Sequence, residues 1–120
     1  MENKDILKFL HQLISHRDIS VEYDETAARY YIDMESGSMI TIECAYAADE
    51  DNRPAYYYAV SLDDEVIMES YSLRNAKKHS AQTKQLIELV RRCSNKVIYQ
   101  EMRARKNGLL QQVGYTKTYN

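Results

Sequence analysis

The sequence predicts an α+β fold: an N-terminal helix, an antiparallel β-meander of four to five strands and a long C-terminal amphipathic helix. Three observations carry this prediction. Apolar residues near the N-terminus recur with a helical period, residues 19–71 alternate with a period of two, and residues 75–106 contain neither Gly nor Pro. The 120 residues, 44% of them hydrophobic, suit a single domain over 1–120, with an ordered core at 1–108 and a tail at 109–120.

The N-terminal helix is predicted from one apolar face and from a plausible start. Asn3 is the expected N-cap, because a short polar side chain can accept a hydrogen bond from the first turn. Polar residues occupy the remaining directions of the helix. The apolar face comprises Ile6, Leu7, Leu10, Leu13 and Ile14.

The strands are predicted from alternation of apolar and polar residues. Four segments place their apolar residues on one side, and a fifth, residues 65–71, has no clear register because Val66 and Ile67 compete for the inward direction. Short turns separate neighbouring segments, so the strands should be antiparallel. The inward residues are Ile19, Val21 and Tyr23; Ala28, Tyr30 and Ile32; Ile40, Ile42, Cys44 and Tyr46; and Tyr56, Tyr58, Val60 and Leu62.

The last helix is predicted over residues 75–106, with Asn107-Gly108 as its C-terminal stop. Val90 is expected at the centre of its apolar arc. At 1.5 Å per residue the helix would exceed roughly 45 Å, so part of it should project or pair with a second copy. The tail carries the apolar anchors Leu109, Leu110, Val113 and Tyr115, and the helix carries the apolar residues Leu86, Val90, Cys93 and Val97.

Charge is strongly segregated along the chain, although the net charge is only −2. Residues 1–72 hold 5 Lys/Arg and 16 Asp/Glu, a net charge of −11, whereas residues 73–120 hold 11 Lys/Arg and 2 Asp/Glu, a net charge of +9. Such segregation bears on partners and on association rates. Of the 12 aromatic residues 11 are Tyr, a residue type enriched at recognition surfaces and also common in half-exposed strands.

No catalytic, metal or cofactor site is predicted. The sequence holds no nucleophile elbow, phosphate-binding Gly-rich loop or HExxH motif, and its three His residues lack metal-ligand spacing. Cys44 and Cys93 are too far apart for a CxxC pair, so both are expected to be reduced packing residues. Without a membrane-spanning apolar run or a signal peptide, the chain is expected to be cytoplasmic, with no membrane partner.

The last helix presents a basic stripe opposite its apolar arc. Cations around one aromatic residue suit phosphates, acidic protein surfaces or nucleotides, although Lys and Arg are also ordinary solvated helix formers. This candidate anion- or partner-binding set comprises Lys84, Arg91, Arg92, Lys96, Tyr99, Arg103 and Lys106.

The sheet face turned away from the helices is the second candidate surface. Its residues are acidic and tyrosine-bearing, so it could receive a basic partner, or it could simply be the solvated face of an antiparallel sheet. This partner face comprises Glu22, Tyr31, Asp33, Glu43 and Tyr57.

These features favour a small non-catalytic binding or regulatory protein that docks a charge-polarised surface on another macromolecule. A protein partner is expected, with an inhibitor of a nucleic-acid-handling protein as one form, in the style of phage or mobile-element inhibitors of host defence. Nucleic-acid or nucleotide binding by the basic helix is the alternative, and an enzyme using Tyr and Arg is the third hypothesis. The unmatched helix length and the opposite charges also predict a homo-oligomer, in the simplest case a homodimer.

Overall fold

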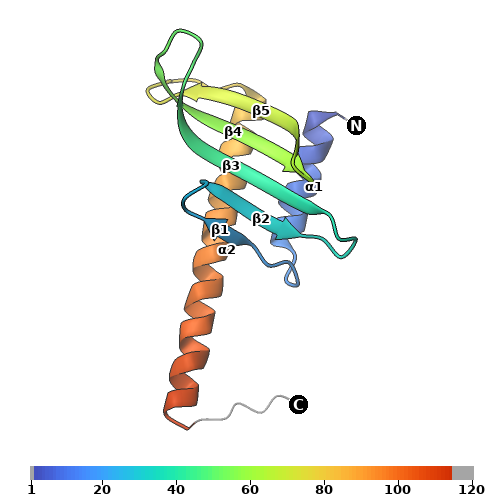
Figure 1. Ribbon diagram of the computed structural model, residues 1–120, viewed down its shortest axis with the longest axis vertical. Helices are drawn as coiled ribbons and strands as arrows, with labels where there is room; N and C mark the ends of the chain where they lie inside the picture. Colours follow the sequence, from blue (N-terminus) through green and yellow to red (C-terminus); the bar gives the residue numbers. More distant parts are fainter. Residues whose placement is uncertain (1, 115–120) are drawn as a thin grey trace.

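The computed structural model describes residues 2–114 and confirms the predicted α+β architecture (Figure 1). Two helices and five strands follow one another as a simple meander, and every neighbouring pair of strands is antiparallel. The sheet order is therefore the chain order, β1-β2-β3-β4-β5. The elements are α1 (Asn3–Ser15), β1 (Glu22–Asp24), β2 (Arg29–Asp33), β3 (Met39–Ala48), β4 (Pro54–Leu62), β5 (Glu65–Leu73) and α2 (Ala81–Gln112).

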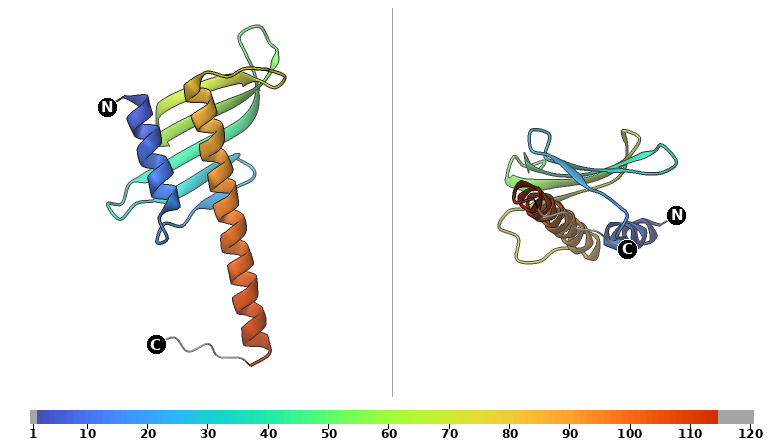
Figure 2. Two further views of the ribbon diagram at one scale, coloured as in Figure 1. Left: turned by 180° about the vertical axis from the view of Figure 1, so that it is seen from behind. Right: turned by 90° about the horizontal axis from the view of Figure 1, so that it is seen from below.

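Both helices cover the same face of the sheet and leave the other face uncovered (Figure 2). The covered face contributes Ile32, Ile42 and Val60 to the core, and all three are at most 1% exposed. Burial of such side chains contributes about 1.5–3 kcal/mol each, so this layer is the main source of stability. We term the uncovered side the open face of the sheet.

α1 buries the face that its periodicity predicts, but the predicted N-cap is wrong. Leu7, Leu10 and Ile14 are buried against the sheet and α2. The helix begins at Asn3 itself, with Glu2 in the N-cap position and no side-chain cap. Asn3 Nδ2 instead donates a hydrogen bond of 3.0 Å to Gln82 Oε1, linking the starts of the two helices.

A β-bulge explains why the register of the fifth strand could not be predicted. Val60 pairs with Met68 but Ser61 pairs with Val66, so Ile67 is an extra residue in β5. Met68 is therefore the buried hydrophobic residue of this strand, while Val66 and Ile67 are both exposed. Neither Val66 nor Ile67 takes the inward position, because the bulge shifts the alternation so that Met68 points into the core.

The bounds predicted for the long helix are wrong at both ends. α2 begins at Ala81, because Ser80 is an N-cap whose side chain accepts a hydrogen bond from the Thr83 amide. Residues 74–80 instead form the connection from β5. At the other end the helix continues through Gly108 to Gln112. A glycine inside a helix destabilises it by only about 1 kcal/mol relative to alanine, so Gly108 does not have to end it.

Only the first part of α2 packs on the sheet. Leu86, Leu89 and Cys93 are fully buried, whereas Val90 is half-buried, so the prediction that Val90 lies at the centre of the apolar arc is wrong. Among the described residues, Gln100 is the last of α2 with a side-chain hydrogen bond to the rest of the domain: it accepts from the Val21 amide at 3.0 Å and donates to the Val21 carbonyl at 2.7 Å. Beyond that point α2 extends away from the sheet, as the length argument predicts (Figure 2).

The expected tail falls into two parts. Leu109, Leu110 and Val113 lie on or directly after α2 and do not join the core. Tyr115 and the remaining residues lie outside the described part of the chain.

A candidate binding corner beside the two helices

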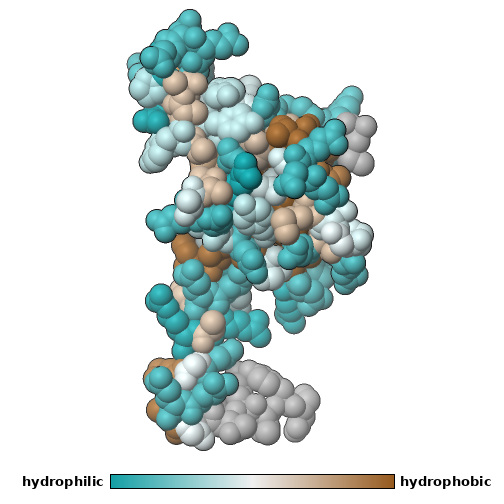
Figure 3. All heavy atoms as spheres, viewed as in Figure 1, coloured by the Kyte–Doolittle hydropathy of each residue, from teal (hydrophilic) through white to brown (hydrophobic). Residues whose placement is uncertain are grey.

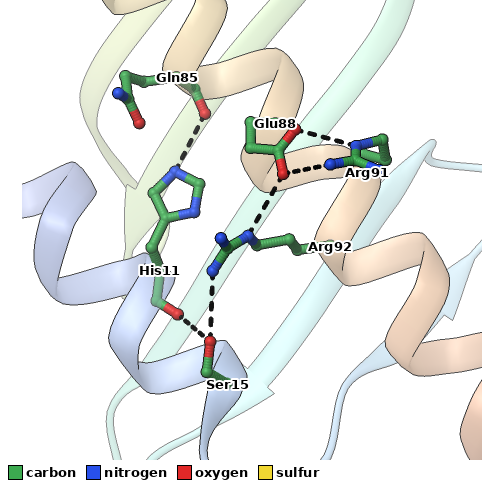
Figure 4. A network of polar contacts seen from close by, with 6 residues as sticks. All are labelled: His11, Ser15, Gln85, Glu88, Arg91 and Arg92. Atoms are coloured by element: carbon green, nitrogen blue, oxygen red, sulfur yellow. Dashed lines mark hydrogen bonds and ion pairs between the residues drawn. The ribbon is translucent and has the colours of Figure 1, made fainter.

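The predicted basic stripe is divided by ion pairs in the middle of α2. Glu88 accepts hydrogen bonds from Arg91 and Arg92, and the Arg91 contact holds the pKa of the Glu88 carboxyl below its usual value (Figure 4). Arg92 also donates to Ser15 Oγ at 3.3 Å, across to α1. Arg91 and Arg92 are thus partly neutralised, and Arg92 helps to join the helices.

His11 reinforces the same junction between the helices. Its Nε2 lies 3.3 Å from the carbonyl oxygen of Gln85, which can only accept a hydrogen bond, so Nε2 carries the proton (Figure 4). Burial, followed by the nearby Arg92 guanidinium, lowers the pKa of His11. The imidazole of His11 therefore links α1 to α2 through the Gln85 carbonyl.

Lys96 is also committed to a structural contact. Its Nζ donates to the carbonyl oxygens of Ile14 at 2.8 Å and His16 at 2.6 Å, at the C-terminal end of α1. The last carbonyls of a helix lack partners within the helix, so a cation there satisfies them and opposes the helix dipole. Burial lowers the pKa of Lys96. This residue therefore anchors α1 to α2, although it also borders the site described next.

Residues at the end of α1 and along the second half of α2 line a concave corner. Figure 2 shows that α2 continues past the end of α1 at this point. The volume of the corner is about 1450 Å³. Among the described residues that line it there are four Lys or Arg side chains and no carboxylate, with apolar atoms from Tyr99, Met102 and Leu110 between them. We term this cleft the basic corner, and its cations are Arg17, Lys96, Arg103 and Lys106.

The corner unites only part of the predicted basic set. Lys96, Tyr99, Arg103 and Lys106 all line it. Lys84 does not, and neither do Arg91 and Arg92, which belong to the Glu88 network. The predicted basic residues therefore do not form one continuous stripe. Three of them, with Tyr99, form a smaller cluster around the second half of α2.

The second half of α2 exposes apolar side chains on an unexpected side. We term residues 98–113 the distal segment. At 100° per residue its apolar residues lie roughly opposite Leu86, Leu89 and Cys93, so the apolar face of the helix changes sides after Val97. Their exposed fractions are 51% for Ile98, 64% for Met102, 60% for Leu109 and 69% for Val113.

The end of the helix is correspondingly hydrophobic on its surface. Figure 3 shows hydrophobic atoms at the far end of α2, well away from the sheet. On the core-facing side of this segment the sequence instead places small or polar residues, including Ala104, Asn107 and Gln111. The apolar residues of 81–97 and of 98–113 each follow a helical period, but the two periods point to opposite sides of the helix.

Sequence reasoning missed every lining residue outside α2, among them His16 and Arg17. These two residues follow α1 directly, about 80 positions before the cations on α2. A helical wheel of one helix cannot reveal a site shared by two helices, and nothing in their spacing marks them. Arg17 is one of five Lys or Arg residues in the acidic half of the chain, so its charge alone does not single it out.

The open face carries all five residues predicted for it. Cross-strand pairing aligns Glu22 with Tyr31 and Asp24 with Arg29, on the side of the sheet away from the helices. Arg29 Nε donates to Glu43 Oε1 at 2.7 Å. The Tyr57 hydroxyl donates to Glu69 Oε2 at 2.6 Å, and this hydrogen bond raises the pKa of Tyr57 to about 12.

Neither cysteine is an activated nucleophile. Burial raises the pKa of the Cys93 thiol to about 12, and burial likewise raises the pKa of Cys44, so both stay protonated near neutral pH.

Within residues 2–114 no three His, Cys, Asp or Glu side chains gather as metal ligands would. In the same range, no helix has the apolar length needed to cross a bilayer. No family model, curated protein or solved structure matches this chain.

Proposed function

We propose that this protein is a non-catalytic binding protein that docks on an acidic region of another protein through the basic corner and the distal segment. The observation that supports this most is the row of exposed apolar side chains on the distal segment. It lies on the side of α2 that faces away from the chain's own sheet, and no other described element covers it.

The energetics of the helix favour a partner on this row. A helical segment that lacks packing partners, as the distal segment does beyond Gln100, is marginal in water, since most helical stability in proteins comes from packing of one face. Burying apolar surface contributes about 25 cal/mol per Å², so covering Met102 and Leu109 alone would add a few kcal/mol. A protein partner supplies such a surface, whereas solvent does not.

The charges beside the row favour an acidic partner. Arg103, Arg105 and Lys106 lie in the distal segment, and Glu101 is its one carboxylate among the described residues. Arginine forms planar, paired hydrogen bonds with carboxylates. Carboxylates on a partner would both match this charge and enter the basic corner, where none of the described lining residues carries a carboxylate.

Binding of nucleic acid or a nucleotide is the second candidate. The same corner favours it, because Arg17, Arg103 and Lys106 could contact phosphates beside the ring of Tyr99. The exposed apolar row has no function in such a complex, and the acidic half of the chain would repel a polyanion. Affinity for duplex DNA should then fall with log salt by about 0.9 per phosphate contacted.

The test is affinity purification from the native host with two double variants. Met102→Asp with Leu109→Asp removes the apolar row, and Arg103→Gln with Lys106→Gln removes two corner cations. We expect a protein held by the wild type to be lost from both, and held by a control that carries Lys84→Gln, since Lys84 lies outside the corner. Nuclease treatment should leave the bound protein in place.

Two outcomes would contradict the proposal. If both folded double variants retain the same proteins as the wild type, the distal segment is not the docking element. If nuclease releases everything that is bound, nucleic acid is the ligand, and the second candidate replaces the first.

A further inference from the structure

We propose that the open face of the sheet receives the distal segment of a second copy of this chain, so that copies associate head to tail. This inference rests on the proposed function, because it uses the same docking segment. It concerns a different receiving surface, and it gives a specific meaning to the charge segregation of the sequence.

The open face has the charge that the distal segment requires. Its outward positions on the five strands carry five carboxylates and one guanidinium, that of Arg29, which is already paired with Glu43. The distal segment carries three cations and one carboxylate. Opposite charges on two surfaces of one molecule favour contact between copies. The carboxylates are those of Glu22, Asp24, Asp33, Glu43 and Glu69.

The open face also has a suitable floor for an apolar helix. Small side chains lie at its centre in β3 and β4, with larger tyrosine rings beside them. The rings of Tyr57 and Tyr71 are in contact, with centroids 4.9 Å apart and a tilt of 47° between their planes, and Tyr71 is 55% exposed. Stiff aromatic side chains around small ones provide contact area at low entropic cost. The small residues are Ala45 and Ala47, which are partly exposed, and Ala55 and Ala59, which are buried beneath their neighbours.

The contact must form between copies and not within one chain. α2 lies on the covered side of the sheet (Figures 1 and 2). By helical periodicity the exposed apolar row lies on the side of α2 opposite its buried residues, and so faces away from that sheet. The open face is on the opposite side. A rigid helix cannot bring its own row there, so the donor segment has to come from another molecule.

The same geometry makes the contact heterologous. One copy offers its helix, the next copy offers its sheet, and each still has its other surface available. The distal segment is about 24 Å long, so a single contact is small compared with a standard stable interface. Association should therefore be weak, should grow with concentration and should not stop at a dimer.

The first measurement is mass against concentration by sedimentation or light scattering. We expect about 14.1 kDa in the low micromolar range, with a rise beyond twice that value toward millimolar concentration. The rise should be reduced at 1 M salt, where exposed charges are screened within about 3 Å. A constant mass of 14.1 kDa over the whole range would overturn the proposal.

The second measurement is a complementation experiment with two double variants. Met102→Asp with Leu109→Asp disables the donor helix, and Glu43→Lys with Glu69→Lys disables the open face, so each variant alone should remain monomeric. Mixed together, they should form a one-to-one pair, because one retains an intact helix and the other an intact face. The matched control, Lys84→Asp, should associate like the wild type, since Lys84 lies in neither surface.

The outcomes separate this inference from the proposed function. If the mixture stays monomeric, or if either variant associates alone, head-to-tail docking is wrong. If the wild type is monomeric but the open-face variant loses a basic protein from the host, that protein is the occupant in place of a second copy. In either case the partner-binding test of the distal segment keeps its own result.

Discussion

The two halves of α2 show how one continuous helix can serve two environments. Residues 81–97 place Leu86, Leu89 and Cys93 on the sheet, and residues 98–113 place their apolar side chains on the other side, in solvent. The first half is helical because the core requires it. Beyond Gln100 the second half continues as a largely exposed helix, and the partner proposed above would supply the packing that this part of the helix lacks.

The largest difference in stability between the two halves of α2 is expected from aspartate substitutions. Leu89→Asp places a carboxylate at a site that is 0% exposed and should cost about 3–5 kcal/mol or more, enough to unfold many small domains. Met102→Asp should change the free energy of unfolding by less than about 0.5 kcal/mol. Urea denaturation checks both values, and equal losses would show that the distal segment is part of the core.

Substitutions of the two cations Lys96 and Arg103 should differ in their effect on the free energy of unfolding, by less than the aspartate substitutions do. Lys96→Met removes two hydrogen bonds to the end of α1 and should cost about 1–3 kcal/mol. Arg103→Gln should be nearly neutral for stability. Thermal melts of the two variants test this difference, and a neutral Lys96→Met would mean that the end of α1 is held by other contacts.

The smallest effect should come from Gly108 in the distal segment. It lies inside the helix with no atom within 4 Å of an added Cβ, so Gly108→Ala should favour local helix by about 0.5–1 kcal/mol. Because this half does not contact the core, amide exchange near residue 108 should slow while the melting temperature stays constant. A clear rise in melting temperature would indicate that the two halves unfold together.

The sequence predicted most of the fold because local patterns determine it. Alternation and short turns fix a meander, and the apolar period fixes both helices. The bulge at Ile67 escaped prediction because it depends on pairing with β4. The helix start escaped because residues 75–80 have no breaker, so only the hydrogen bond from the Thr83 amide to Ser80 marks it.

The candidate site was predicted less well, for a physical reason. Helical spacing correctly groups Tyr99, Arg103 and Lys106, because neighbours on one helix face need no tertiary information. It cannot show that Lys96 is occupied by carbonyls of α1 or that Arg17 approaches from the following loop. The positions of the residues on the open face were predicted correctly, since they follow from strand alternation alone.

The bulge in β5 has a consequence for the behaviour of the sheet at its edge. β5 is an outer strand of nine residues with Val66 and Ile67 exposed, and a flat strand of that kind would be a template for uncontrolled edge-to-edge aggregation. The extra residue interrupts the regular ladder and increases the local twist. An incoming strand therefore cannot align along the whole edge, which protects the protein at high concentration from amyloid-like growth.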